Sequence, residues 1–271
     1  MIPRAWIDEW RATAPWSSDA WVEQDLVISR ALVEMYRVEA IAERLAFRGG
    51  TALYKLYLTP AARYSEDIDL VQVAPQAIGE TLDLVKSVLD PWLGEPQRKF
   101  KEGRVNLVYR FASEATPPVR MRLKIEINSR EHFAELGFAK VPFAVESRWF
   151  TGSADVTTFA LDELLGTKLR ALYQRKKGRD LFDLWHGLDR GIVDEDALVR
   201  CFERYLREGG HTVTRAQFEA NLAEKAGMKE FRGDIGPLLR PEIGWDFDAA
   251  MAGVCERLVA RLAGEAWKGV G

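Results

Sequence analysis

The chain has 271 residues, of which 47% are hydrophobic and 29% are charged, and its formal net charge is −3. This composition predicts a soluble globular protein of one or two domains and disfavours disordered and fibrous classes. The slight acidity excludes the overall basic charge of a protein that coats nucleic acid non-specifically, so a nucleic-acid contact has to be a local patch.

The sequence also bears on location and on cysteine chemistry. No apolar run approaches the ~20 residues of a membrane helix, and Asp8 and Glu9 stand where a signal peptide would be cationic and then apolar. We therefore expect a cytoplasmic protein with no membrane partner. Cys201 and Cys255 have no Cys/His cluster near them, which favours two ordinary thiols over a disulfide scaffold or a zinc site.

The first part of the chain alternates helical and extended patterns. Residues 19–43 are expected to form a helix, because apolar residues recur along one stripe of that segment. The pattern then predicts, in chain order, a strand at 45–48, the pair Gly49-Gly50, a helix at 51–58 ended by Thr59-Pro60, a strand at 67–73 and a helix at 76–90.

Two further strands are expected at 104–111 and 119–128, joined through the turn at Pro117-Pro118. The second alternates, so that Lys124 and Glu126 share its polar face. Beyond about residue 155 the strand signals disappear and three or more helices are expected, at about 158–176, 179–190 and 246–264. The fold class is therefore α+β, with a mixed sheet and flanking helices in residues 1–150, followed by an α-helical C-terminal part in residues 151–271.

Asp67 and Asp69 form the first candidate site. If 67–73 is a strand, the two carboxylates project from one face, about 6.5–7 Å apart at the backbone. Such oxygen ligands suit Mg²⁺ or Mn²⁺, which bind through one or two carboxylates plus substrate phosphates. Glu126 is a candidate third metal ligand. An Asp-x-Asp pair is also common in solvated turns and helix caps, whereas an EF-hand loop is disfavoured because its glycine is absent.

Gly49 and Gly50 form a second candidate site, directly before a predicted helix. Backbone N–H groups at such a turn, together with the positive end of the helix dipole, bind phosphate. A tight turn from strand to helix explains the pair equally well.

These segments resemble a known family. The stretch Phe47-Arg48-Gly49-Gly50-Thr51-Ala52-Leu53, followed by Arg63-Tyr64-Ser65-Glu66-Asp67-Ile68-Asp69-Leu70, is similar to the GGT and R-x-S-E-D-x-D motifs of the AbiEii/AbiGii nucleotidyltransferase toxins, which include MenT-like toxins. Glu23-Gln24-Asp25-Leu26 is similar to the entry helix of that family. The resemblance spans about residues 20–190 and is most specific in its first motif.

The resemblance implies a DNA polymerase β-like nucleotidyltransferase fold in residues 1–150, with a helical domain at 151–271 that completes the active-site cleft. It also implies a bacterial toxin with a cognate antitoxin. The reaction expected is transfer of NMP from an NTP to an RNA acceptor, such as the tRNA 3′ end, with Mg²⁺ or Mn²⁺ bound. Asp67, Asp69 and Glu126 are the expected metal ligands and, with Lys168, the catalytic residues; nucleotide binding is expected of Gly49, Gly50, Thr51, Arg63, Ser65 and Lys168.

Three of these assignments have an alternative. Arg48 and Arg63 flank the phosphate site and could neutralise a triphosphate, yet surface arginines are common. Ser65 could simply make a local turn hydrogen bond. Lys168 lies on the apolar stripe of its helix, where a lysine either extends to the edge or is held by an anion, here the triphosphate by resemblance.

The segment after Lys168 is basic. It is either a solvated helix end or an RNA phosphate track, with Arg170, Arg175, Lys176, Lys177 and Arg179 as contacts. By resemblance, Asp180 or Asp183 orients a basic partner or the substrate. Two alternatives to RNA transfer remain open. They are nucleotidyl transfer to a protein or small-molecule hydroxyl, and binding of NTP or RNA without catalysis.

Overall fold

The computed structural model describes residues 2–114 and 117–269, and the chain divides into two compact units. The first unit ends at Phe159 and the second begins at Ala160. The domain boundary expected after residue 150 stays a prediction, and the extreme ends of the two expected domains lie outside the described residues.

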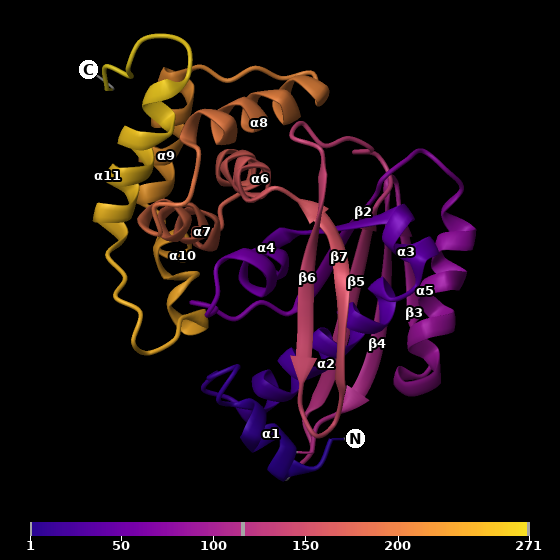
Figure 1. The fold of residues 1–271 in the computed structure, drawn as a ribbon. Helices are drawn as coiled ribbons and strands as arrows, with labels where there is room; N and C mark the ends of the chain where they lie inside the picture. The colour runs from indigo at the N-terminus through magenta and orange to yellow at the C-terminus, as the bar shows by residue number, and fades with distance from the viewer. Residues whose placement is uncertain (1, 115–116, 270–271) are drawn as a thin grey trace. The chain divides into compact units, whose positions relative to one another are not determined.

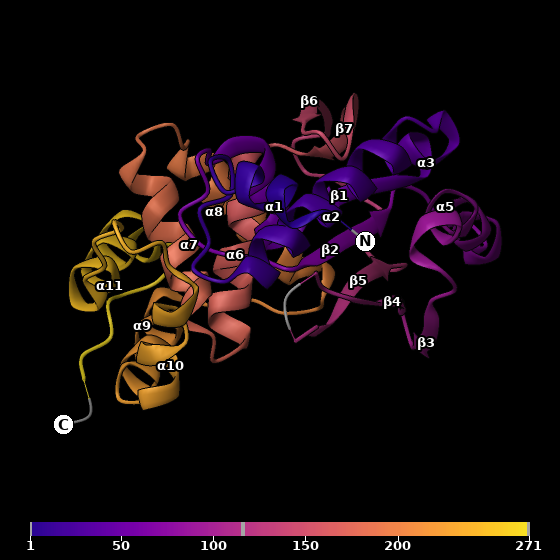
Figure 2. The same cartoon turned by 90° about the horizontal axis from the view of Figure 1, so that it is seen from below.

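The first unit is built on a seven-stranded mixed sheet with the strand order β3-β4-β5-β2-β1-β7-β6 (Figures 1 and 2). The pairs β1–β7 and β2–β5 are parallel, and the other neighbouring pairs are antiparallel. The strands are β1 (Leu45–Arg48), β2 (Asp67–Gln72), β3 (Gln97–Lys101), β4 (Arg104–Ala112), β5 (Arg120–Asn128), β6 (Phe138–Glu146) and β7 (Thr151–Phe159). The predicted α+β class with a mixed sheet is confirmed.

Helices of the first unit cover the apolar face of this sheet. Along β5, Leu123, Ile125 and Ile127 are fully buried, as the alternation predicts, and α2 packs against β5 and β7. Figure 2 shows α3 and α5 on the same side of the sheet. The helical segments are α1 (Arg4–Trp10), α2 (Asp19–Tyr36), α3 (Glu39–Arg44), α4 (Gly49–Ala52), a π-helical turn (Leu53–Tyr57) and α5 (Ile78–Leu93).

The structure corrects several expected elements. The helix expected over 19–43 is two helices, because the backbone of Val38 is extended between α2 and α3. The helix expected from residue 158 starts at Leu161, since Thr158 lies in β7, pairs with Phe47 and donates a 2.6 Å hydrogen bond to its carbonyl oxygen. Strands β3, β6 and β7 were not expected at all.

Arg30 of α2 holds the hairpin formed by β6 and β7 against the helices. Its guanidinium lies 4.2 Å from the ring centre of Trp92 and 4.6 Å from that of Trp149, and its Nε donates to Glu34 at 2.9 Å. Trp92 belongs to α5, whereas Trp149 lies in the turn between β6 and β7. One cation therefore joins three elements that are distant in sequence.

We expect Arg30→Met to lower the free energy of unfolding by about 2 kcal/mol, because two cation–π contacts of about 1 kcal/mol each are lost. Urea unfolding followed by tryptophan fluorescence measures the change. Arg44→Met is the control, since Arg44 pairs with the exposed Glu80 and such pairs contribute little. Equal stability of Arg30→Met and the wild type would show that the stacked rings pack without help from the cation.

The second unit is α-helical. Helix α6 packs against both α7 and α8, and α7 packs against α11. Its helices are α6 (Leu161–Gln174), α7 (Gly178–Asp189), α8 (Glu195–Glu208), α9 (Arg215–Ala226), α10 (Lys229–Gly233) and α11 (Phe247–Arg257), with 3₁₀ turns at Gly236–Leu238 and Val259–Arg261. Across both described ranges, no helix combines the length and apolar character that crossing a bilayer requires.

Candidate active site

Asp67 and Asp69 lie on the polar face of β2. Ile68 and Leu70 alternate with them and are buried on the opposite, apolar face. Both carboxylates are half-buried and share one side of the sheet, as the strand prediction requires.

Neighbouring strands place charged residues beside this pair. Across β2 and β5, Asp67 is in register with Lys124 and Asp69 with Glu126, while Arg48 of β1 is in register with Asp69 from the other side. The ammonium of Lys124 lies 3.1 Å from Oδ2 of Asp67 and 3.2 Å from Oε2 of Glu126. Lys124 therefore bridges two of the three expected metal ligands.

Burial and the close spacing of charged side chains on this face of the sheet shift the pKa values of Asp69 and Lys124. Burial and then the charge of Asp67 raise the pKa of the Asp69 carboxyl, against the opposing effect of Arg48. Burial alone would lower the pKa of Lys124, but the charges and hydrogen bonds of Asp67 and Glu126 raise it. A cation next to Asp69 would relieve its unfavourable charge.

The donor set fits a magnesium ion that is completed by substrate. Within the described ranges, no group of three or more His, Cys, Asp or Glu side chains could hold a metal by itself. Mg²⁺ does not need such a group, because one or two carboxylates plus phosphate oxygens and water complete its shell. Among the described residues, the side chain of Asp69 has no hydrogen bond or ion pair, so its oxygens are available to a cation.

The glycine turn lies directly against the carboxylates. Gly49 has φ +83°, and a Cβ there would collide with Oδ2 of Asp69. A Cβ at Gly50 would collide with the guanidinium of Arg63 and approach Oγ of Ser65 at 3.1 Å. The absence of side chains therefore lets the backbone pack between the acidic pair and the loop that carries Arg63 and Ser65.

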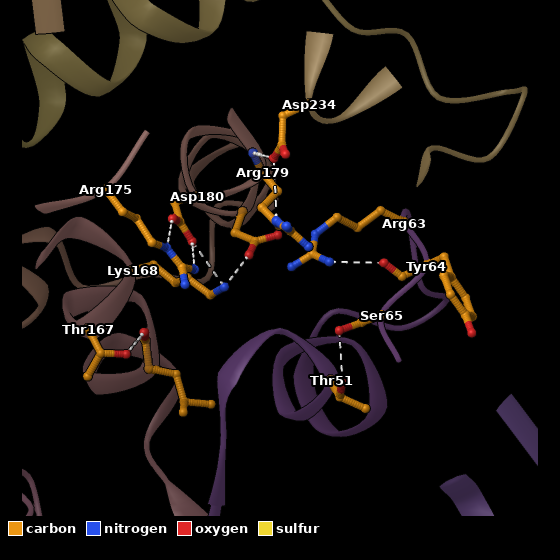
Figure 3. Close-up of polar contacts among 12 residues, drawn as sticks. Thr51, Arg63, Tyr64, Ser65, Thr167, Lys168, Arg175, Arg179, Asp180 and Asp234 are labelled. Atoms are coloured by element: carbon orange, nitrogen blue, oxygen red, sulfur yellow. Dashed lines mark hydrogen bonds and ion pairs between the residues drawn. The ribbon is translucent and has the colours of Figure 1, made fainter. Parts of the chain in front are cut away.

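Hydrogen bonds fix this turn to β2 and to the loop before it. Thr51 Oγ1 donates to the backbone oxygen of Asp67 at 2.6 Å. It also lies 2.8 Å from Oγ of Ser65 (Figure 3). Arg63 is buried, donates to the backbone oxygen of Tyr64 at 3.0 Å and stacks over the ring of Tyr54. The structure thus brings together the predicted nucleotide-binding residues of the first unit.

In the second unit, Lys168 of α6 is buried with two carboxylates of α7. Its ammonium lies 2.8 Å from Asp183 and 3.3 Å from Asp180, and both aspartates are fully buried. Arg175 also donates to Asp180, at 2.6 Å and 2.7 Å (Figure 3). Each of these two basic residues is therefore held by an anion within its own unit.

The remaining cations of the basic segment also have partners in the second unit. The guanidinium of Arg170 stacks over Tyr205, and Lys176 lies 3.4 Å from Glu224. Lys177 and Arg179 both pair with Asp234. The segment is therefore less positive than its sequence suggests, although the side chains of Arg175, Lys176 and Lys177 are about half exposed.

We expect Asp183→Asn to lower the free energy of unfolding by about 3 kcal/mol, because breaking a buried ion pair leaves Lys168 poorly compensated. Urea denaturation provides the measurement. Glu208→Gln breaks the exposed pair with Arg204 on α8 and should change stability by less than about 1 kcal/mol. If the two variants were equally stable, the buried cluster would have no special structural role.

Comparison with known proteins assigns the class. The sequence matches the family model "Nucleotidyl transferase AbiEii toxin, Type IV TA system" over residues 30–253. The match covers most of the chain, so the chain belongs to the AbiEii family of nucleotidyltransferase toxins of toxin–antitoxin systems. It is a nucleotidyltransferase. No curated protein matches the sequence significantly.

Solved structures show the same fold. MenT4, a nucleotidyltransferase toxin from Mycobacterium tuberculosis H37Rv, is 23% identical, with a TM-score of 0.72 over 97% of this chain and 91% of that one. A putative nucleotidyltransferase from H. pylori is 20% identical, with a TM-score of 0.54 over 89% of this chain and 95% of that one. The nucleotidyltransferase fold expected from the sequence motifs is confirmed.

Sequence reasoning did not give Lys124 a place in the site, although it placed this lysine on the same strand face as Glu126. The alternation of β5 was a sufficient signal, because it places Lys124 and Glu126 on one face, two residues apart. It also missed Glu131, which pairs with Arg48 at 2.5 Å. No local pattern marks that residue.

Proposed function

We propose that this nucleotidyltransferase moves an NMP group from an NTP to the 3′-hydroxyl of an RNA acceptor, the tRNA 3′ end, and thereby blocks translation. The acceptor oxygen attacks the α-phosphorus, the bond to pyrophosphate breaks and the hydroxyl proton is released. The observation that supports this most is the packing of Gly49 against the carboxylate of Asp69, because it puts the proposed phosphate-binding turn next to the proposed metal ligand.

Asp67 and Asp69 would hold Mg²⁺ or Mn²⁺, which when bound neutralises phosphate charge and lowers the pKa of the attacking hydroxyl. Glu126 is the third candidate ligand, and it becomes available when Lys124 releases it. The N–H groups at Gly49 and Gly50 and the hydroxyls of Thr51 and Ser65 would orient the triphosphate. The buried guanidinium of Arg63 places a fixed positive charge beside the same turn.

The second unit would contribute basic side chains that contact the two substrates. Lys168 would contact the triphosphate, with Asp180 and Asp183 orienting its ammonium through the ion pairs described above. Arg170, Arg175, Lys176, Lys177 and Arg179 would contact RNA phosphates, the half-exposed side chains most directly. A cognate antitoxin would neutralise the activity in the cytoplasm.

Nucleotide incorporation tests the proposal. Purified protein is incubated with Mg²⁺, total tRNA and each of the four labelled NTPs in turn, and label is expected in the RNA fraction. Label found exclusively in protein or in small molecules would assign a different acceptor to the same chemistry. Asp69→Ala separates catalysis from sequestration, because a protein that acts by binding alone would keep most of its effect on translation.

A further inference from the structure

A cavity of about 370 Å³ lies within the first unit, beside the candidate active site. Its walls come from α1 and the turn after it, α2, the helical residues 49–57, the following loop and β6. Thr51, Arg63 and Ser65 line the cavity and also surround the glycine turn. A ligand in this cavity can therefore be continuous with a phosphate bound at Gly49 and Gly50, and the volume is of the size that small-molecule sites have.

One wall of the cavity is a buried ion pair. Asp25, 5% exposed, accepts hydrogen bonds from the indoles of Trp10 at 3.0 Å and Trp16 at 3.3 Å. The ammonium of Lys55 donates to Asp25 at 2.7 Å and to Ser29 at 2.9 Å. Three cavity-lining side chains thus donate to one carboxylate, and Lys55 links a fourth, Ser29, to the same cluster.

This pair has unused hydrogen-bonding capacity. An ammonium has three donors, and those of Lys55 serve Asp25 and Ser29 among the described residues, which leaves one. A carboxylate has about four acceptor positions, and three hydrogen bonds reach Asp25 from the residues described, which again leaves one. An adjacent donor and acceptor match the edge of a nucleobase, where a donor and an acceptor also lie side by side.

Aromatic groups line the rest of the cavity. Trp10, Trp16, Tyr54 and Phe143 contribute to its walls, and the first three are almost completely buried by the fold. Bases stack on aromatic side chains, and each stacked base contributes about 1–3 kcal/mol.

We propose that this cavity binds a nucleobase, stacked on its aromatic walls and hydrogen-bonded to Lys55 and Asp25. The inference rests on the proposed nucleotidyl transfer and assigns the cavity to the nucleoside moiety of a reactant. That nucleoside is either the one in the NTP or the one that ends the RNA acceptor. The two sources share the same chemistry and differ in which constant changes when the cavity is filled.

Filling the cavity tests the inference. Ala144 is an exposed residue of β6 that lines the cavity, so Ala144→Trp adds bulk there without disturbing a packed core. Ala139→Trp is the matched control, because Ala139 lies on the same strand and does not line the cavity. Calorimetry with Mg²⁺ gives the Kd of each NTP and of inorganic tripolyphosphate, and incorporation kinetics give the KM for tRNA.

In Ala144→Trp we expect either the Kd of the NTPs or the KM for tRNA to rise by at least about tenfold, with tripolyphosphate binding changed by less than about twofold. A rise in the Kd of the NTPs places the base of the NTP in the cavity, and a rise in the KM for tRNA places the base of the acceptor there. Lys55→Met should in addition reduce the discrimination among the four NTPs or among acceptor ends.

Two results would overturn the inference while leaving the proposed function intact. One is a wild-type enzyme that incorporates nucleotides and an Ala144→Trp variant with unchanged constants. The other is an equal effect of Ala139→Trp. A wild-type protein that neither binds an NTP nor incorporates a nucleotide would instead remove the proposed function, and the inference with it.

Discussion

Asp69→Asn is expected to reduce nucleotide incorporation by more than about 100-fold, since even residues that merely orient metal ligands cost about 10–100-fold when replaced. The same variant should have a higher Tm than the wild type in metal-free buffer near neutral pH. The raised pKa of Asp69 means that its ionised form destabilises the folded state, and asparagine carries no charge. Incorporation assays and thermal unfolding measure the two effects.

The difference in stability between Asp69→Asn and the wild type should also change with pH and with added metal, each in a defined direction. Because the folded-state pKa of Asp69 is raised, the stability advantage of the variant should shrink as the pH falls through that pKa and the wild-type carboxyl becomes protonated. Added Mg²⁺ should raise the Tm of the wild type more than that of the variant. Asp83→Asn, at an exposed position of α5, is the control and should behave as the wild type. A fully active Asp69→Asn enzyme would exclude this carboxylate as a metal ligand.

Gly49→Ala should have the second largest effect. An added methyl group would displace the Asp69 carboxylate, and the backbone at φ +83° disfavours a side chain by about 1–2 kcal/mol. We expect activity to fall by more than about 100-fold, because both the turn and the carboxylate are moved.

Gly137→Ala separates the effect of the backbone angle from the effect of displacing the Asp69 carboxylate. Gly137 has nearly the same backbone angle, φ +79°, but among the described residues no heavy atom outside Gly137 and its two chain neighbours lies within 4 Å of the added Cβ. Its replacement should lower stability by a similar backbone contribution and leave incorporation unchanged. The comparison needs steady-state kinetics and urea unfolding of both variants. If Gly49→Ala retained activity, the close approach of turn and carboxylate would be irrelevant to catalysis.

Sequence alone predicted the elements that carry a strong burial pattern. β5 alternates between buried apolar and partly exposed polar residues, and the predicted strands 45–48 and 67–73 are short segments that end at or near Gly49 and Pro75. The missed strands β3 and β6 bury few of their residues. β3 is exposed along its whole length, and β6 is an edge strand that contains Pro142. Pairing with a neighbouring strand, not local preference, makes these segments extended.

The candidate site likewise has one part that the sequence predicts and one part that it does not. Gly49, Gly50, Asp67 and Asp69 lie within one short stretch, so motif and strand period were enough to place them together. The cavity depends instead on the register of distant segments. Asp25 of α2 meets Lys55 of the π-helical turn and the two tryptophans near the N-terminus, and no local periodicity encodes such a meeting.

The bridge made by Lys124 has a consequence for how the enzyme matures. Asp67 and Glu126 already have a counter-ion that is encoded in the chain and forms part of the sheet. A newly synthesised copy can therefore complete its central strands before it encounters any divalent ion. The proposed metal loading would then be an exchange of one cation for another, and a chelator should silence the enzyme while its architecture persists.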